Sequence, residues 1–200
     1  MHSRYTGPEM AHIWSEESRF QKMLDVEVAA AKAMAYAGII PKEAAKDITA
    51  KAGFDIARIQ EIEAETRHET IAFLTAVKEN IGDNARYLHY GMTSSDVLDT
   101  GFSLQLRAAA DVLIADLEEL LSVIKLRIEE HRLTPCIGRS HGIHAEVTTF
   151  GLKLAGHYEI VGKFDFTNVA VDFLNEQGLA GSILADVIIF FNGDPAAVIF

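Results

Sequence analysis

The segment Gly138–Glu146, with the sequence Gly-Arg-Ser-His-Gly-Ile-His-Ala-Glu, carries a dense group of side chains that can do chemistry. Two imidazoles, His141 and His144, and the guanidinium of Arg139 lie between glycines, which let a backbone approach a ligand closely. Histidine exchanges protons near neutral pH, and arginine binds anions. The segment is typical of a site that transfers a proton on an anionic substrate, although such a His pair taken alone is more often structural.

Three further polar clusters stand where loops and helix starts are expected, the usual places for ligand-binding groups. Arg4 and Tyr5 offer a cation and a hydroxyl to a phosphate. Residues 66–69 begin a predicted helix, where unpaired amides and Arg67 favour an anion. Residues 89–96 bring three hydroxyls to the start of the longest predicted helix, a place suited to a carboxylate or phosphate. Simple helix capping and an ordinary surface arginine are the structural alternatives.

Histidines in three separate loops, His68, His89 and His141, favour acid–base chemistry on a polyanion. A zinc site would need a third and a fourth ligand, yet the chain has a single cysteine and no HExxH spacing, so no metal is expected. A Ser-His-Asp hydrolase is disfavoured because the sequence has no GxSxG motif and no alternation of strands with helices.

Composition indicates a folded protein of one or two domains, since the 200 residues are 49% hydrophobic with only 4 prolines. The formal net charge of -11 argues against a nucleic-acid partner or an anionic membrane surface but is compatible with a small anionic substrate. The single Cys136 and an N-terminus without an apolar signal core lead us to expect a cytoplasmic protein. No apolar stretch approaches the roughly 18 residues that would span a bilayer.

Periodicity and capping residues predict helices through residue 163, punctuated by short loops. Pro8 suits a first helical turn, Ser15 and Asp55 suit N-caps, and Gly38, Gly53 and Gly82 suit helix ends. The expected helices cover about 8–14, 15–38, 41–53, 55–66, 68–81 and 94–132. After Pro135 we expect a loop at 138–142 and a last helix from about Ala145 to Lys163.

The helix predicted over 94–132 is the dominant element, some 38 residues or roughly 57 Å long. Apolar residues on it alternate spacings of four and three, a coiled-coil-like stripe that calls for partner helices. The stripe comprises Leu106, Ala110, Leu113, Leu117, Leu120 and Ile124, with Glu118, Glu119, Lys125 and Arg127 outside it. A buried face within one bundle is the simpler alternative to packing between subunits.

Four motifs occurring in order resemble the bacterial adenylosuccinate lyases, a family of the fumarase and aspartase superfamily. They are Arg4-Tyr5 with Pro8-Glu9-Met10, Thr66-Arg67-His68, Gly91–Asp96, and Gly138–Glu146 followed by Thr148–Ala155. The resemblance covers residues 1–163. It implies an all-α fold in which an N-terminal helical domain leads into a long-helix bundle.

The resemblance implies a lyase of purine biosynthesis that acts without a cofactor. Such enzymes cleave adenylosuccinate to AMP and fumarate and make the equivalent cut in the succinyl-carboxamide ribonucleotide on the way to IMP. The family is homotetrameric, its long helices form a central bundle, and three subunits build each active site. The implied partners are therefore a nucleotide substrate and other copies of the chain, with no nucleic acid and no membrane.

The resemblance also assigns roles to residues of this sequence. His141 is implied as the general acid that protonates the leaving nitrogen, with His68 as the second catalytic residue. The implied phosphate ligands are Arg4, Tyr5 and His89, and the implied ligands of the succinyl part are Thr93 and Ser94. The whole implied substrate-binding set is Arg4, Tyr5, Arg67, His68, Glu69, His89, Thr93, Ser94 and Ser140.

The sequence departs from the family at several points. Glu69 stands where Asp is usual, Val147 stands where Pro is usual, and Ser140 replaces the commoner Thr while keeping a hydroxyl. Residues 164–200 do not match the family, and the loop that carries its serine base is missing. We therefore expect a truncated chain, inactive by itself, with domains at 1–93 and 94–163 and a divergent tail at 164–200.

Three interpretations remain open on the sequence. The first is an adenylosuccinate lyase by descent. The second is a sister lyase acting on another succinyl or dicarboxylate substrate, for which the Arg4-Tyr5 pair would have no use. The third is a non-catalytic helical module for oligomerisation or nucleotide binding, and the missing base loop favours it.

Overall fold

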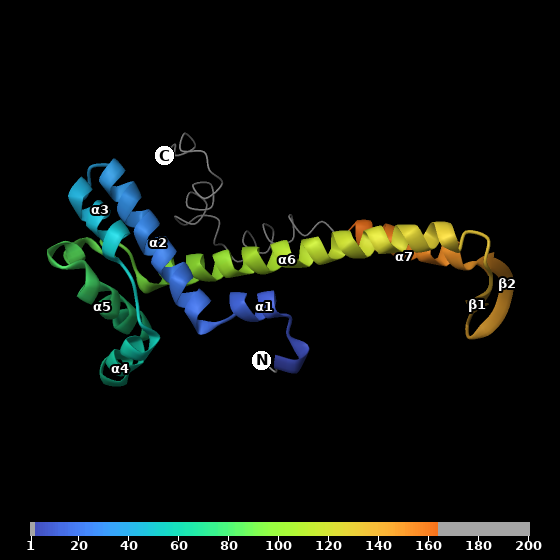
Figure 1. Ribbon diagram of the computed structural model, residues 1–200, viewed down its shortest axis with the longest axis horizontal. Coiled ribbons are helices and arrows are strands. Elements are labelled where there is room, and N and C mark those ends of the chain that lie inside the picture. Colours follow the sequence, from blue (N-terminus) through green and yellow to red (C-terminus); the bar gives the residue numbers. More distant parts are fainter. Residues whose placement is uncertain (1–2, 164–200) are drawn as a thin grey trace. The chain divides into compact units, whose positions relative to one another are not determined.

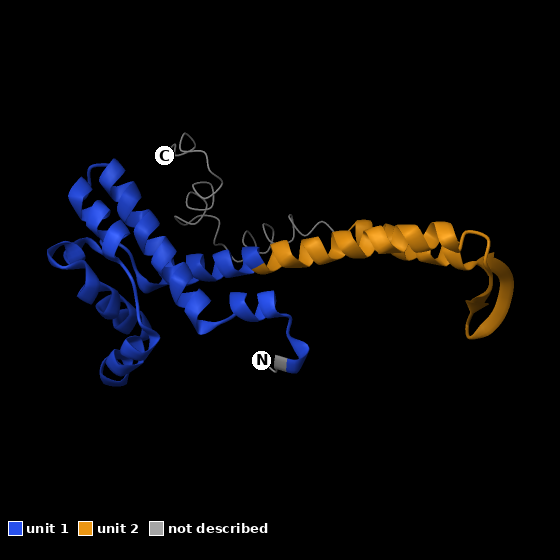
Figure 2. Ribbon diagram, in the orientation of Figure 1, with its two compact units in different colours: residues 1–108, 174–200 blue, residues 109–173 orange. Residues whose placement is uncertain are grey.

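The structure, a computed structural model, describes residues 3–163, which divide into two compact units (Figures 1 and 2). Unit 1 holds the described residues up to Ala108, and unit 2 holds those from Ala109 onward. The division falls inside the longest helix. The domain boundary expected at 93 and 94 coincides with the start of that helix and stays a prediction, and the expected tail at 164–200 lies outside the described residues.

Seven α-helices, two short 3-10 helices and one two-stranded sheet make up the described residues, which confirms the all-α fold class. None of these helices combines the length and apolar character needed to cross a bilayer. In chain order the elements are η1 (Ser3–Tyr5), α1 (Pro8–Ile13), α2 (Glu16–Tyr36), α3 (Lys42–Lys51), α4 (Ile56–Thr66), α5 (Glu69–Ile81), η2 (Asp83–Tyr87), α6 (Ser94–Glu130), β1 (Pro135–Ser140), β2 (Ile143–Thr149) and α7 (Phe150–Gly162).

Three predicted helix starts are confirmed by their caps. The Ser15 hydroxyl accepts a hydrogen bond from the Ser18 amide at 3.1 Å at the start of α2. The Asp55 carboxylate accepts one from the Ala57 amide at 3.0 Å at the start of α4. Pro8 is the first residue of α1, where its missing N–H removes no helical hydrogen bond.

The core of unit 1 is built around three aromatic rings. Phe20 of α2 stacks on Phe73 of α5 with ring centroids 5.6 Å apart, and Phe54 tilts against both at 5.9 and 6.2 Å. Burying each such ring stabilises the fold by about 1.5–3 kcal/mol. The packing of these rings therefore fixes the helices between which the loops of unit 1 run.

Helix α6 is one continuous helix of 37 residues, close to the predicted range. Its first turn is closed by Asp96, whose carboxylate accepts the Thr93 amide at 2.7 Å. Further along, the buried Gln105 side chain donates to the Ile13 carbonyl at 2.7 Å, which fixes the start of α6 to the end of α1. The first contact caps α6, and the second joins its N-terminal part to α1 within unit 1.

The segment after α6 corrects the sequence-based prediction. Residues 135–149 form an antiparallel β-hairpin, whereas a loop at 138–142 and a helix from Ala145 were expected. Strand β1 pairs with β2 from Pro135 opposite Thr149 to Ser140 opposite Ile143. Helix α7 begins only at Phe150, with the Thr149 hydroxyl capping it.

The turn explains why the hairpin forms. His141 and Gly142 both have positive φ, 53° and 77°, and positive φ at both central residues is what a two-residue hairpin turn of type I′ requires. The β-branched run Val147-Thr148-Thr149 favours extended backbone over helix. From its sequence context Gly142 was expected to let the backbone approach a ligand, whereas in the structure Gly142 forms this turn.

A close backbone approach joins the start of α7 to the end of α6 in unit 2. The Gly151 amide donates to the His131 carbonyl at 3.0 Å, and the His131 ring meets Phe150 edge-on at 5.1 Å. A Cβ on Gly151 would lie 2.8 Å from the Ile128 carbonyl oxygen and 2.9 Å from the Arg132 Cα. Only glycine fits at this position without a backbone shift.

We expect Gly151→Ala to lower the free energy of unfolding by about 1–3 kcal/mol, because the new methyl group meets backbone on three sides. Gly156→Ala is the matched control on the same helix: no atom lies within 4 Å of its added Cβ, so helix propensity should raise stability by up to about 1 kcal/mol. Urea unfolding compares the two variants, and hydrogen exchange across 128–151 locates the change. Equal stabilities would show that α6 and α7 do not meet as described.

Candidate active site

His68 caps helix α5 with its own side chain. Its Nδ1 accepts a hydrogen bond from the Ile71 amide at 3.3 Å, and the Thr66 hydroxyl contacts the His68 carbonyl at 3.5 Å. The cap is therefore His68 and not Thr66. Because Nδ1 is the acceptor here, the hydrogen of the neutral ring lies on Nε2. The exposed imidazole thus presents an N–H donor to a ligand.

Arg67 ends helix α4 in the left-handed conformation, with φ 55° and ψ 29°. It lines a shallow polar hollow of about 330 Å³ together with Gln60, Glu63 and Ala64. The hollow contains one cation and one carboxylate. Arg67 is therefore the side chain of this hollow that can bind an anionic group.

Glu69 is held by an ion pair to the preceding long helix. Its carboxylate lies 2.5 Å from the Arg19 guanidinium of α2, and both side chains are about one-third exposed. The hydrogen bond to Glu69 raises the pKa of Arg19 above its ordinary value. The pair fixes the first turn of α5 to α2, so Glu69, expected to line the substrate site, already has a cationic partner.

His89 is held by a buried carboxylate from the same helix α2. Glu27 Oε1 lies 2.6 Å from His89 Nδ1, and Glu27 Oε2 accepts the His89 amide at 2.9 Å. The Glu27 side chain is fully buried, and the His89 side chain is 18% exposed. The imidazole of His89 is thus bound on one edge and open on the other.

Thr93 and Ser94 stand at the N-terminus of α6, as predicted. The Thr93 hydroxyl donates to Asp96 at 3.0 Å, so this group serves the helix cap and keeps its oxygen lone pairs for a further donor. The Ser94 hydroxyl makes no hydrogen bond to another described residue. A hydroxyl and unpaired helix amides are therefore available to an anion here.

His141 lies at the tip of the hairpin in unit 2, between the strand ends Ser140 and Ile143. His141 and Ser140 are both exposed, and Arg139 pairs across the strands with His144. Opposite Gly138 the strands approach so closely that a Cβ would lie 2.9 Å from the Glu146 carbonyl oxygen. The hairpin therefore presents the imidazole of His141 to solvent on a short, defined turn.

Arg4 and Tyr5 lie in η1 at the start of unit 1, and both side chains are exposed. Each also takes part in an interaction elsewhere in the chain. Their position at the surface suits contact with a ligand group that arrives from outside the chain.

Backbone conformation distinguishes three of the predicted site residues. Arg67, His89 and His141 are the non-glycine residues with positive φ among those the structure describes, at 55°, 63° and 53°. Side chains rarely adopt this conformation, which costs roughly 1–2 kcal/mol per residue and clusters at functional sites. Each of the three loops identified from sequence chemistry therefore carries one such residue.

The structure groups the predicted residues by unit. Arg4, Tyr5, the 67–69 cluster, His89, Thr93 and Ser94 belong to unit 1, while Ser140 and His141 belong to unit 2. Sequence reasoning missed Arg19 and Glu27, which anchor two of the clusters to α2. A signal for Glu27 existed, since it stands at an apolar position in the helical series Phe20, Leu24, Glu27, Ala31.

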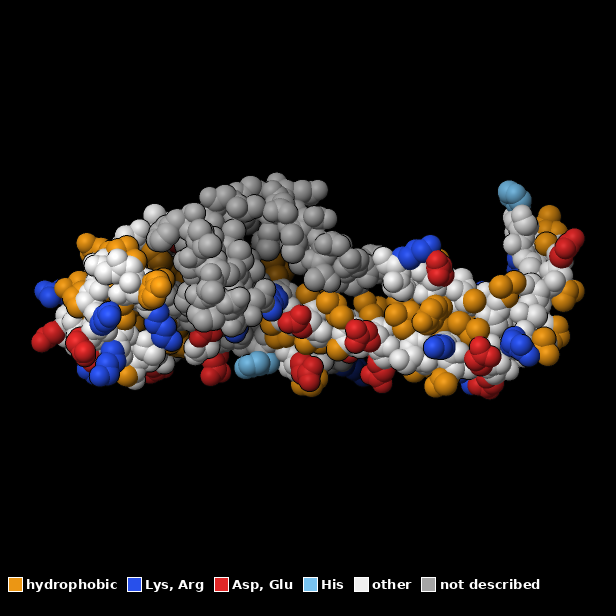
Figure 3. Space-filling model, turned by 90° about the horizontal axis from the view of Figure 1, so that it is seen from above, with side chains coloured by type: hydrophobic (Ala, Val, Ile, Leu, Met, Phe, Trp, Pro, Cys, Tyr) orange, Lys and Arg blue, Asp and Glu red, His pale blue; other side chains and the backbone are white. Residues whose placement is uncertain are grey.

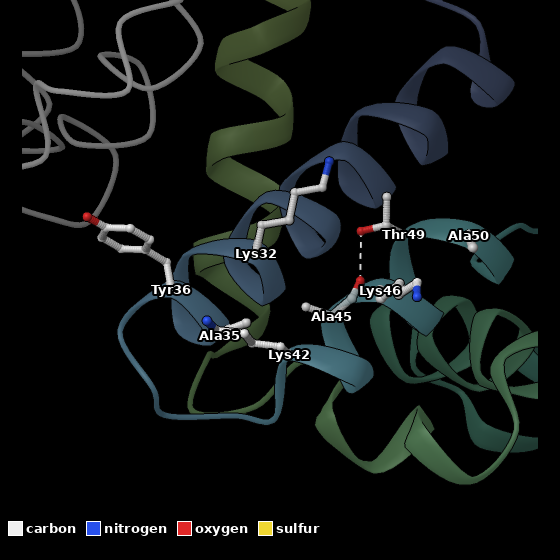
Figure 4. Close-up of a pocket in the computed structure, with 8 residues that line it drawn as sticks. All are labelled: Lys32, Ala35, Tyr36, Lys42, Ala45, Lys46, Thr49 and Ala50. Carbon is white, nitrogen blue, oxygen red and sulfur yellow. Dashed lines mark hydrogen bonds between the residues drawn. The ribbon is translucent and has the colours of Figure 1, made fainter.

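A groove between α2 and α3 lies away from these residues (Figure 4). It encloses about 460 Å³ and is bordered by Lys32, Lys42 and Lys46, while Thr49 at its edge donates to the Ala45 carbonyl at 2.7 Å. None of the site residues predicted from sequence lines it. The candidate active site is therefore made of the loops and not of this groove.

Comparison with proteins of known function gives a consistent result. The chain is 54% identical over 156 residues to an adenylosuccinate lyase of Synechocystis sp., covering 78% of the chain and 36% of that relative. It is 50% identical over 159 residues to an adenylosuccinate lyase of Bacillus subtilis, covering 80% and 37%. The chain thus spans a little over a third of the length of the curated relatives it matches.

Solved structures agree on the fold. A fumarate lyase from Mesorhizobium sp. superimposes with a TM-score of 0.73 at 29% identity, covering 77% of this chain and 37% of that one. A 3-carboxy-cis,cis-muconate lactonizing enzyme from Pseudomonas putida gives 0.71 at 37% identity, covering 78% and 37%. The resemblance found from the four motifs is confirmed. Because the family model described as lyase matches residues 2–165, well over half of the sequence, the chain belongs to the lyase family.

Proposed function

We propose that this chain supplies the N-terminal part of an adenylosuccinate lyase active site. The reaction is the β-elimination that gives AMP and fumarate, together with the equivalent cleavage of the succinyl-carboxamide ribonucleotide in cytoplasmic purine biosynthesis. The observation that carries the proposal is the coincidence of left-handed backbone with Arg67, His89 and His141, one in each of three loops. The similarity to curated adenylosuccinate lyases supports the choice of substrate.

His141 is proposed as the general acid. A two-residue turn presents its ring at the tip of the hairpin, where it can donate a proton to the departing nitrogen. His68 is proposed as the second imidazole of the site, and its Nδ1 cap leaves Nε2–H as the donor. Neither step needs a metal or an organic cofactor.

Charge that develops on the succinyl carboxylate is proposed to be stabilised at the start of α6. The Ser94 hydroxyl and the helix amides lie where the helix dipole is positive, and the Thr93 hydroxyl would donate to the carboxylate by exchanging its hydrogen bond to Asp96 for one to the substrate. The proton on the neighbouring carbon goes to the serine base that the family resemblance assigns to a loop outside these residues. Arg4, Tyr5 and His89 are proposed to bind the phosphate, which is held alike before and during the reaction.

A sister lyase on another dicarboxylate is the second candidate, favoured by the similarity to the fumarate lyase and the muconate lactonizing enzyme. The two candidates differ in their use of phosphate. A substrate without phosphate gives Arg4 and Tyr5 no role, so the kinetic effect of changing Arg4 separates them.

The long helix is proposed to assemble copies of the chain into the tetrameric bundle of the family. Four large apolar side chains of α6 in unit 2 are exposed: Leu113, Leu120, Val123 and Leu126. Figure 3 shows hydrophobic side chains along this part of the molecule, with acidic and basic groups beside them. Leu113 and Leu120 belong to the stripe predicted from sequence, and exposed apolar side chains at such spacing are typical of helices that pack against partners.

We expect substitution of the proposed acid to change kcat and substitution of the proposed phosphate ligand to change KM. The test protein is a chimera that joins residues 1–163 of this chain to the remaining sequence of the Bacillus subtilis relative. His141→Asn should lower kcat by about 10²- to 10⁴-fold with little change in KM, because proton donation matters only in the transition state. Asparagine tolerates positive φ, so the turn survives. Arg4→Gln should chiefly raise KM for adenylosuccinate.

Fumarate release measures both effects, with the exposed His157→Gln on α7 as control. The 200-residue chain alone is a second control, since the sequence leads us to expect no turnover from it. An exchange of the two phenotypes would contradict the role assignment. An Arg4→Gln chimera with unchanged KM would favour the sister lyase.

We expect two variants of His68 to separate its cap from its chemistry. His68→Asn keeps a side-chain acceptor for the Ile71 amide, so the free energy of unfolding should be unchanged, whereas His68→Ala should lose about 1 kcal/mol. Both should lower kcat of the chimera, since both remove the imidazole. Urea unfolding and fumarate release provide the measurements. Full activity of the His68→Asn chimera would show that His68 caps helix α5 and takes no part in the reaction.

We expect the double variant Leu113→Glu with Leu120→Glu to block self-association, because the new charges would be buried between helices. Glu119→Gln, on the same helix but outside the stripe, should leave association unchanged. Sedimentation equilibrium gives the mass of each variant. If the parent chain and the double variant have the same mass, α6 does not assemble the chain through this stripe.

A further inference from the structure

Glu27 is an unusual residue for the place it occupies. It is 1% exposed and is the only charged residue classed as buried in the described part of the chain. It occupies the core face of α2 with Phe20, Leu24 and Ala31. A buried carboxylate is costly unless it is paired and hydrogen-bonded, and an apolar side chain would fill the same space without that cost. Folding alone therefore does not explain Glu27.

Both oxygens of Glu27 are used on one residue. Oε2 accepts the His89 amide at 2.9 Å, and Oε1 lies 2.6 Å from His89 Nδ1. The first contact holds the backbone at φ 63°, and the second fixes the ring. An ionised carboxylate has only acceptor sites, so its partner in a contact of this length would be Nδ1–H. The remaining ring nitrogen, Nε2, is on the opposite edge from Glu27.

The residue at position 89 is equally unusual. Positive φ favours glycine, and Gly38, Gly82 and Gly91 fill such positions elsewhere in unit 1. Here a histidine takes the conformation, and its side chain keeps 18% of its surface exposed beside a wholly buried partner. The combination stabilises one orientation of an accessible imidazole four residues before Thr93.

We infer that Glu27 is a positioning residue for the proposed reaction: its carboxylate accepts Nδ1–H of His89 and fixes one orientation of the ring, so that Nε2 faces the phosphate of the substrate. The inference rests on the proposed function for the identity of the ligand. For Nε2 to donate to the phosphate while Nδ1–H stays on Glu27, the ring must carry a hydrogen on both nitrogens, and such a ring lies between two anionic partners. Glu27 does not touch the substrate and acts through His89 alone.

The first test measures which nitrogen of the His89 ring carries the hydrogen in the 200-residue chain. Nitrogen NMR of the imidazoles distinguishes Nδ1–H from Nε2–H, and comparison with His89→Asn assigns the signal. We expect His89 of the parent chain in the Nδ1–H or doubly protonated form, with a shift toward the Nε2–H form in Glu27→Gln. A parent ring in the Nε2–H form overturns the inference, and that result requires only the parent chain and the folded His89→Asn variant, not a folded Glu27 variant.

The second test reads the consequence for the substrate in the chimera. Glu27→Gln should raise KM for adenylosuccinate by about 10-fold or more with a smaller effect on kcat, and Glu27→Asp should recover part of the loss. Glu17→Gln, exposed on the same helix, is the matched control. An unchanged KM in a folded Glu27→Gln variant also overturns the inference. A chimera that is inactive with Glu27 intact counts against the proposed function. In that case the NMR measurement of the His89 tautomer still tests whether Glu27 positions the ring.

Discussion

Helix α2 is the support on which the loops of unit 1 depend. Two side chains about two turns apart on it, Arg19 and Glu27, reach Glu69 at the start of α5 and His89 before α6. Both contacts are charge-assisted hydrogen bonds, which are shorter and stronger than neutral ones. The rings of Phe20 and Phe73 then fix α2 against α5. A shift of α2 would displace both clusters together, so their relative placement is a property of this helix.

The three left-handed residues show how differently a protein can hold a strained backbone. Arg67 ends a helix with its amide bonded to the Glu63 carbonyl. His141 forms half of a hairpin turn whose other half is a glycine. His89 alone is held by a buried side chain, Glu27. The first two conformations follow from local chain geometry, whereas the third requires a residue 62 positions away. Long-range support of this kind is what fixes the direction of the His89 side chain.

Much of the fold could be predicted because its signals are local. Three helix starts could be predicted from the side chains of Ser15, Asp55 and Pro8. Helix α6 could be predicted from its uninterrupted apolar repeat. The hairpin was missed because His-Gly was interpreted as a ligand loop and not as a pair of residues able to take positive φ. Arg19 and Glu27 were missed because their partners are distant in sequence. The motif residues of unit 1 lie at loops and helix ends as expected, whereas Ser140 lies in a strand, and the hydrogen-bond partners of these residues needed the structure.

The proposed acid and the proposed substrate-lining residues differ in how they are held, and this difference bears on catalysis. Arg67, His68 and Glu69 sit on the base formed by α2, α4 and α5, while His141 sits on a hairpin whose surface is largely exposed. Within unit 2, the hairpin is held at its root by the Gly151 and His131 contact, some distance along the strands from its tip. A catalytic acid needs placement within a fraction of an ångström. The described contacts inside unit 2 fix the turn but leave the tip without a packed neighbour, so the groups that complete the placement of His141 have to come from other segments or other copies. The assembly proposed for α6 would bring such groups from other copies of the chain to the exposed hairpin.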